Sequence, residues 1–284
     1  MFFFFMNETK SNVRNAIKDV ISELMENVLN SVLVKNPFIS ERFHAEKPLY
    51  AALVPDEIFK GSHFERRFVT RFGNTWEKLA FVVANANMGG ATIQAKIDGN
   101  ILEGRLKRIQ EILNAEDHGT KENKKRKPNW EEDLKYVLKG KGEPIPCQVV
   151  CDLLVEDKRT NKKYAFELKA PLPNSDQTKV SKEKMLKLMS MDNHPVEEAF
   201  LGLVYNPWGI RDKYEWSFPK KWFDLKKDKS LLIGDELWDF LGGKGTYQKF
   251  ISEINKLGRN YKEQIYKDYL GIEPMEEILN INLK

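Results

Sequence analysis

Three ionisable residues near the middle of the chain, Asp152, Glu167 and Lys169, stand in apolar surroundings. Asp152 lies inside the hydrophobic run 148–155, and Glu167 has a hydrophobic neighbour on each side. A buried carboxylate without a partner is costly, so such an acid is usually paired or bound to a metal ion. Lys169 follows Glu167 by two positions and therefore lies on the same face of a strand. We expect the three side chains to converge at the edge of a sheet, where a cation would relieve the repulsion between the two acids.

Two strands must hold these residues. The pattern predicts strands over 148–155 and 163–169, joined as a β-hairpin by a polar turn. A helix is predicted over 181–191 and a third strand over 200–205, which stops at Asn206-Pro207. The order strand, strand, helix, strand is typical of a mixed α/β core.

Helical patterns precede this core. A helix is predicted over 11–34, because its apolar residues recur at spacings of three and four: Val13, Ile17, Val20, Ile21, Leu24, Val28 and Val32. A second helical pattern over 62–86 has an interruption near Gly73 and is closed by Gly89-Gly90. Two shorter helices are predicted over 101–115 and 130–138.

The simplest organisation is a single domain over residues 1–284 with one α/β core. The catalytic core is expected at about 140–210, with a helical N-terminal part over 7–138 and a helical C-terminal part over 211–284. We find no internal repeat and no obvious linker between these parts.

The charge balance is mildly basic, with 46 Lys and Arg against 42 Asp and Glu and a formal net charge of +4. This sum does not by itself indicate nucleic acid, because acids in a metal site would cancel bases lining a groove. Residues 121–127 hold a basic run, which is typical of a solvated loop and is also suited to a phosphate backbone.

The two cysteines, Cys147 and Cys151, have no second Cys/His pair at zinc spacing, so we expect no zinc site. They fit a reducing cytoplasm, where thiols stay free. The apolar run at the N-terminus ends at Met6, an alternative start, and is too short for a secretory signal. Since no segment approaches ~20 apolar residues, no transmembrane helix is expected, and the chain is predicted to be cytoplasmic.

An Asp followed after a gap by Glu-x-Lys resembles the signature of the restriction-endonuclease-like, or PD-(D/E)xK, nuclease superfamily. Here Asp152 is followed after fourteen residues by Glu167-Leu168-Lys169, and Cys151 replaces the Pro that often precedes the Asp. The resemblance implies a restriction-endonuclease-like mixed β-sheet flanked by helices, with helical N- and C-terminal extensions. The alternative is an ordinary salt bridge between Glu167 and Lys169 on a solvated face.

The stretch from Phe166 to Asn174, followed by Gln177 and Lys182, is similar to the TdeIII/MjaII family of type II restriction endonucleases. This resemblance implies a homodimer that cuts double-stranded DNA with Mg²⁺ at a short palindrome, GGNCC. A cognate DNA methyltransferase would act on the same site and need not bind the enzyme. Three alternatives remain open: a nuclease of DNA repair or junction resolution, a DNA-binding module without catalysis, and a structural α/β protein.

The resemblance also assigns roles to the central residues. Mg²⁺ takes oxygen ligands and keeps several waters. Asp152 and Glu167 would each give a carboxylate oxygen, and Leu168 would give its backbone carbonyl. Lys169 would hold the attacking water or neutralise charge that develops on the phosphate.

Members of the superfamily often take another acid from an N-terminal helix, and Glu77 is our candidate for this catalytic role. The alternative is a solvent-facing Glu paired with a Lys one turn away. Glu57 and Glu65 are weaker candidates.

DNA contacts are expected directly after the catalytic strand, near the scissile phosphate. The candidates are Asn174, Gln177, Lys179, Lys182 and Lys184. Asn and Gln can read adenine, and Arg or Lys favour guanine, but such side chains can also bind phosphates without reading sequence. The sequence leaves open which residues read bases.

Overall fold

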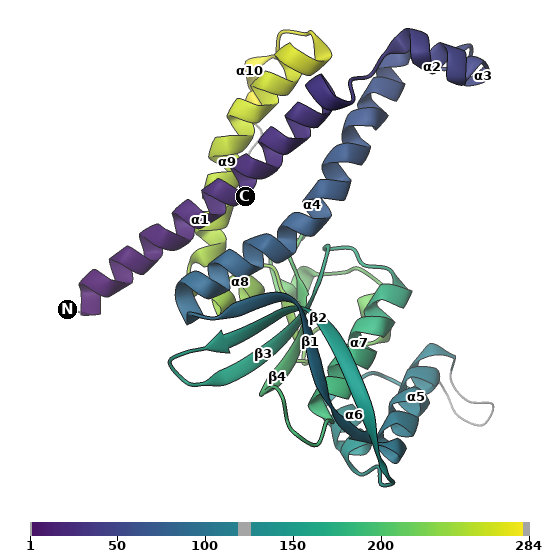
Figure 1. Cartoon of the computed structure of the whole chain (residues 1–284), viewed down its shortest axis with the longest axis vertical. Coiled ribbons are helices and arrows are strands. Elements are labelled where there is room, and N and C mark those ends of the chain that lie inside the picture. Colours follow the sequence, from purple (N-terminus) through teal and green to yellow (C-terminus); the bar gives the residue numbers. More distant parts are fainter. Residues whose placement is uncertain (1, 119–125, 281–284) are drawn as a thin grey trace. The chain divides into compact units, whose positions relative to one another are not determined.

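The computed structural model describes residues 2–118 and 126–280, with side chains from Val13 onward (Figure 1). Most of the basic run at 121–127 therefore lies outside the described residues. The chain divides into two compact units. The sheet unit is Ala80–Tyr247, and the helical unit is Met1–Leu79 together with Gln248–Lys284. The core expected at 140–210 lies inside the sheet unit, which is longer at both ends. The organisation of the whole chain as a single domain stays a prediction.

The sheet unit is built on a five-stranded mixed sheet in the order β1-β2-β3-β4-β5. The strands are β1 (Ala91–Leu102), β2 (Pro144–Asp157), β3 (Lys162–Lys169), β4 (Glu198–Leu203) and β5 (Leu231–Ile233). The first three pair antiparallel, whereas β4 pairs parallel with both β3 and β5. Parallel strands need a crossover, and helix α7 (Ser175–Met189) supplies it between β3 and β4.

Strand β2 is shared unequally by its two neighbours. Its pairing with β1 extends over nearly the whole strand, while its pairing with β3 covers only residues 153–157. The last β2–β3 pair is Leu153 with Phe166, so Asp152 stands at the point where β2 separates from β3. The β2–β3 pairing therefore ends at the predicted site.

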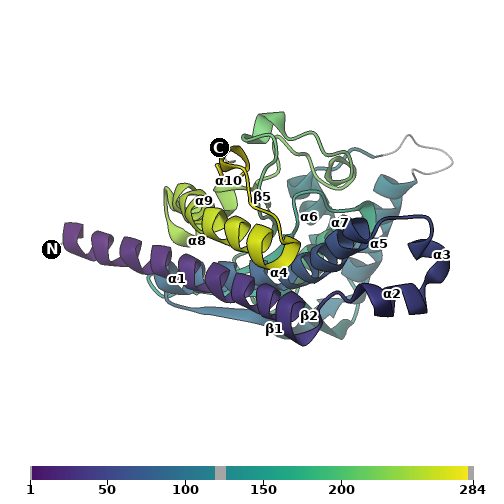
Figure 2. The ribbon, with the colours of Figure 1, turned by 90° about the horizontal axis from the view of Figure 1, so that it is seen from above.

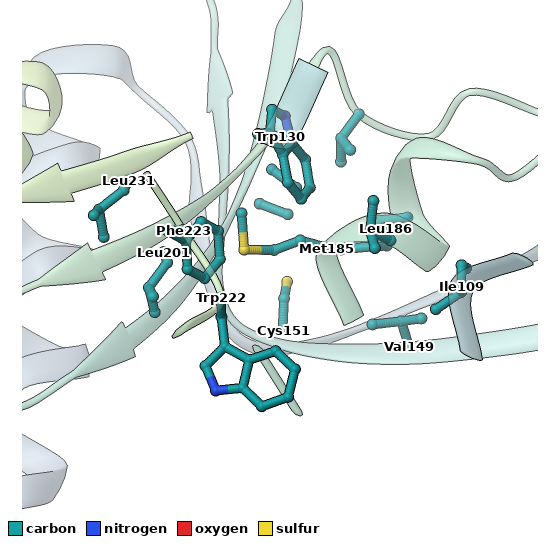
Figure 3. Close-up of a cluster of buried hydrophobic side chains, with 14 of the residues drawn as sticks. Ile109, Trp130, Val149, Cys151, Met185, Leu186, Leu201, Trp222, Phe223 and Leu231 are labelled. Atoms are coloured by element: carbon teal, nitrogen blue, oxygen red, sulfur yellow. The ribbon is translucent and has the colours of Figure 1, made fainter. Parts of the chain in front are cut away.

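Helices α5 (Glu103–Asp117), α6 (Trp130–Leu138) and α7 share one core with the sheet. Figure 3 shows this cluster, in which Cys151 of β2, Met185 of α7 and Trp130 of α6 face a common interior. In β3, Ala165 belongs to this core and Glu167 shares its face by alternation. Burying this apolar surface positions α7 directly behind the residues expected to do chemistry.

A second, aromatic cluster holds helix α8 (Asp235–Gly242) against the sheet. The rings of Phe166 and Phe200 are stacked with centroids 5.2 Å apart, and Phe240 of α8 lies 5.8 and 5.1 Å from them. Phe166 and Phe200 are also register partners in β3 and β4. Because Phe166 precedes Glu167, this packing turns the acid toward α7.

The first part of the helical unit contains α1 (Phe2–Asn30), α2 (Ser40–Glu46), α3 (Pro48–Ala51) and most of α4 (Asp56–Met88). Helix α1 continues as a π-helical turn (Ser31–Lys35). The second part contains most of α9 (Thr246–Gln264), a π-helical turn (Ile265–Leu270) and α10 (Glu276–Leu279). All seven apolar residues that predicted the first helix are buried. Figure 2 shows α1 alongside α9, where Tyr261 Oη donates to the Ser22 carbonyl at 3.3 Å.

Four expectations about the elements need correction. The helix predicted to break near Gly73 is continuous from Asp56 to Met88, because one glycine costs only about 1 kcal/mol and its packed neighbours outweigh it. No strand is predicted over 91–102, where β1 lies, although its burial alternates as that of a half-buried strand should. Helix α7 begins six residues before the predicted start at 181. The C-terminal part is helical only in places, since turns fill most of 204–230.

None of the helices in the described ranges combines the length and apolar character that crossing a bilayer requires.

Candidate active site

Asp152 anchors the site at the opening of the β2–β3 hairpin. Its Oδ2 accepts a hydrogen bond from the backbone N–H of Leu168 at 2.8 Å, taking the place of a strand partner. The same oxygen accepts from Lys169 Nζ at 3.0 Å. The side chain is 13% exposed, so it is not fully shielded from solvent.

Glu167 is more deeply placed, with a side chain only 2% exposed. Burial raises the pKa of Glu167, and the nearby charge of Asp152 raises it further, while Lys169 and Lys184 act in the opposite direction. The alternative of a solvated Glu167–Lys169 pair is therefore wrong, because one partner is almost completely shielded from water.

Lys169 brings the site together. Its ammonium lies 3.0 Å from Asp152 Oδ2, 3.5 Å from Glu167 Oε2 and 3.1 Å from the Leu168 carbonyl oxygen. Burial alone would lower the pKa of Lys169, but the two carboxylates outweigh that effect and raise it. The predicted convergence of the trio is confirmed: the two acids come from adjacent strands and share one cation.

Two further residues reach these acids. Lys184 Nζ of α7 donates to both oxygens of Glu167, at 2.9 and 3.1 Å. Gln94 of β1 points its Nε2 at Asp152 Oδ1 from 3.4 Å, a long contact. Gln94 also has a φ of +50°, a conformation that costs a non-glycine residue about 1 kcal/mol or more. Gln94 is not among the predicted site residues, because no strand is predicted over 91–102.

The five candidate DNA contacts separate into different roles. Asn174 and Gln177 form a reciprocal capping box at the start of α7. Both are exposed, so DNA contact stays a prediction for them. Lys179 pairs with Asp117 at 2.9 Å and is 29% exposed, and its role in DNA binding is also a prediction. Lys184 faces Glu167 and is 31% exposed.

The prediction that Lys182 contacts DNA is wrong. Its side chain is 0% exposed, and its ammonium contacts Glu116 at 2.6 Å, Asp133 at 2.7 Å and the Trp222 carbonyl at 2.8 Å. Arg126 also pairs with Asp133. With no surface and all its donors occupied, Lys182 supports the core and does not contact DNA.

The predicted extra acid, Glu77, lies in α4 within the helical unit and is half-buried. Glu57 and Glu65 lie on the same helix and are exposed. A catalytic role for any of the three stays a prediction.

The donor set of the trio suits a hard divalent cation. Two carboxylates and the Leu168 carbonyl surround the Lys169 ammonium, and all are oxygen donors of the kind Mg²⁺ prefers. In the described ranges no three Asp, Glu, His or Cys side chains gather closely enough to bind a metal by themselves. A cation here would complete its shell with water or substrate oxygens.

Comparison with known proteins gives the chain a family. The family model of the type II restriction endonuclease HinfI matches residues 13–258. The chain belongs to this family of type II restriction endonucleases. It is therefore a site-specific deoxyribonuclease whose substrate is double-stranded DNA, and enzymes of this kind use divalent metal ions.

Three relatives support the assignment. The type II restriction enzymes HgiEI and HgiCII of Herpetosiphon aurantiacus are 26% and 27% identical over 223 and 231 residues. These matches cover 75% and 79% of this chain and 77% and 82% of the relatives. MjaII of Methanocaldococcus jannaschii is 29% identical over 187 residues, 59% of this chain and 47% of its own length. The matched family is that of HinfI, and the narrower TdeIII/MjaII assignment is not confirmed.

Proposed function

We propose that Asp152, Glu167 and Lys169 form the catalytic centre of this restriction endonuclease and that its metal ion is Mg²⁺. The observation that carries the proposal is the position of the Lys169 ammonium, which is held by both carboxylates and the Leu168 carbonyl. Three oxygen donors directed at one cation describe a site that also suits a metal ion.

The chain's own residues have distinct tasks in this proposal. Asp152 is held in place by the Leu168 N–H, so its carboxylate is oriented before any ligand arrives. Glu167 is buried and held by two lysines, so its oxygens have few alternative positions. Bound Mg²⁺ supplies polarisation of the phosphate and a water of lowered pKa.

Lys169 has a separate task in this scheme. Were Mg²⁺ held by the carboxylates, the Lys169 ammonium would be available to orient the attacking water or to neutralise negative charge that develops on the phosphate. Lys184 lies on α7 and donates a hydrogen bond to Glu167, so it acts as a positioning residue for that carboxylate.

The proposed recognition site is the palindrome GGNCC, and this proposal rests on the resemblance of residues 166–182 to the TdeIII/MjaII family. Each chain carries one such trio among its described residues, so symmetric cutting of both strands needs a second copy, and we propose a homodimer. A methyltransferase acting on the same site completes the proposal. The free thiols of Cys147 and Cys151 are compatible with a reducing cytoplasm, where we place the enzyme.

One digestion tests the recognition site and the metal requirement together. A long plasmid is incubated with purified protein and Mg²⁺, and the ends of the fragments are sequenced. Discrete fragments whose ends share flanking GG and CC support the assignment, whereas discrete fragments with other ends overturn GGNCC alone. A smear or structure-specific nicks would return the repair nuclease as the better hypothesis. The same reactions repeated with a metal chelator test the need for a divalent ion.

A further inference from the structure

A pocket of about 510 Å³ lies wholly within the helical unit. It is formed by the π-helical end of α1, the turn that follows, helix α2 and the first half of α4. None of its lining residues belongs to the sheet unit, so it is distinct from the trio.

The lining of this basic pocket is strongly cationic. Its permanently charged residues are five cations and one acid: Lys35, Arg42, Lys47, Arg66, Arg67 and Glu46. Their net charge of +4 equals the formal charge of the whole chain. The one acid, Glu46, is already paired with Arg42 at 2.7 Å. Such a concentration of like charge is unfavourable unless an anion offsets it.

Packed aromatic side chains line part of the basic pocket. The rings of Phe43 and Phe59 lie 4.3 Å apart, and Phe38 packs 5.7 Å from Phe43 and 5.8 Å from His63. His63 Nε2 is 2.8 Å from the carbonyl oxygen of Asn36, which ties the turn after α1 to α4. The cations are therefore presented from packed elements.

The cations themselves are accessible. Arg42 has a side chain 75% exposed, and Arg66 and Lys47 are also exposed. The Arg42–Glu46 pair connects adjacent turns of one short helix in contact with water, and such a pair contributes little. Arg42 can therefore exchange Glu46 for a phosphate at small cost.

We propose that the basic pocket is a contact site for the phosphate backbone of duplex DNA, which assigns the helical unit a DNA-holding role. The proposal rests on the function proposed above, since the duplex is the substrate of the trio. Phosphate is the anion that DNA offers in every sequence, and guanidinium groups match its geometry. Contacts of this kind supply affinity and register without reading bases.

The test measures how DNA affinity depends on salt. Dissociation constants for a duplex containing the cleavage site and for one without it are measured over a range of KCl concentrations, with Asp152→Ala present throughout to prevent cutting. The test variant is Arg42→Ala/Arg66→Ala. The matched control, Lys18→Ala/Lys267→Ala, removes the same charge from exposed positions elsewhere in the helical unit.

Each lost phosphate contact lowers the slope of log affinity against log salt by about 0.9, so the test variant should lose about 1.8 units of slope. Its affinity should fall about tenfold or more, and equally for both duplexes. Arg42→Lys/Arg66→Lys keeps the charges and should retain most of the slope. Thermal melts check that the variants fold.

Three results would overturn the inference. An unchanged slope in the test variant would remove DNA as the ligand and leave the pocket to an acidic protein surface. An equal fall in the control would mean that only overall charge matters. A loss confined to the duplex with the cleavage site would indicate base reading. Failure of the unmodified protein to cut or bind DNA is a different result, because it removes the proposed function first.

Discussion

Replacing Lys184 by Met should impair catalysis through Glu167. Lys184 donates to both oxygens of a carboxylate that is 2% exposed, and the two lysines of the site balance its two acids. Hydrogen bonds to charged groups contribute roughly 1.5–3 kcal/mol. If the transition state for cleavage loses this stabilisation, kcat/KM should fall roughly 10- to 150-fold.

The assay must separate this role from the DNA contact that the sequence suggests for Lys184. A positioning residue changes kcat and raises the metal concentration needed for half-maximal cleavage, while KM for DNA stays nearly constant. Calorimetric titration of the DNA-free protein with Mg²⁺ gives a second readout that does not depend on turnover. Lys184→Arg should recover much of the activity, because it can still donate to both oxygens.

The matched control is Lys187→Met, less than one turn along the same helix. Lys187 is 29% exposed, against 31% for Lys184, and pairs with Glu183 at 2.7 Å. The Lys187→Met substitution should leave kcat and the metal concentration needed for half-maximal cleavage unchanged. A positioning role for Lys184 is excluded if Lys184→Met raises KM and lowers the salt dependence of binding while metal affinity is unaltered, since that is the behaviour of a phosphate contact.

The remaining predictions concern the trio and the buried cluster. Alanine at Asp152, Glu167 or Lys169 should reduce plasmid cleavage by roughly 1000-fold or more in folded protein, and full activity of Lys169→Ala would exclude its role. Lys182→Met should lower the free energy of unfolding by about 3–5 kcal/mol in urea titrations, with unchanged DNA affinity of the folded fraction. Burial raises the pKa of Glu116 from about 4.5 to about 8, so its contribution to stability is present below pH 4.5 and is lost as the pH rises to 8. Glu116→Gln should therefore flatten the dependence of the melting temperature on pH in that window, and an unaltered profile would count against the raised pKa.

The strands that carry Asp152, Glu167 and Lys169 were the predictable part of the fold. Two acids with apolar neighbours require compensation wherever they are buried, and a Lys two positions from Glu167 must share its face. These constraints are local, so Asp152, Glu167 and Lys169 could be placed together without any knowledge of the helices. The contact of Asp152 with Gln94 was not predictable in the same way, because it depends on the pairing of β1 with β2, which are distant in the chain.

Residue type alone could not separate helix caps from DNA contacts. Asn and Gln side chains that can read a base are equally suited to bind backbone groups at the start of a helix. Asn174 and Gln177 do the latter, which means that α7 starts at Ser175. With a predicted start at 181, both residues would lie in a loop, and the residues that follow could not be assigned to a face of the helix.

The position of each residue around α7 decides which of Lys182 and Lys184 faces the core. Counted along a helix from Ser175, Lys182 lies four residues after the buried Thr178 and three before the buried Met185, so it shares their inward face. Lys182 obeys the same principle as Glu167: a buried charge must have partners, and here they come from Glu116 and Asp133. Those partners are 66 and 49 residues distant in the chain, and no local pattern predicts them. A charged residue on the apolar face of a helix is therefore better interpreted first as part of a buried pair than as a ligand for DNA.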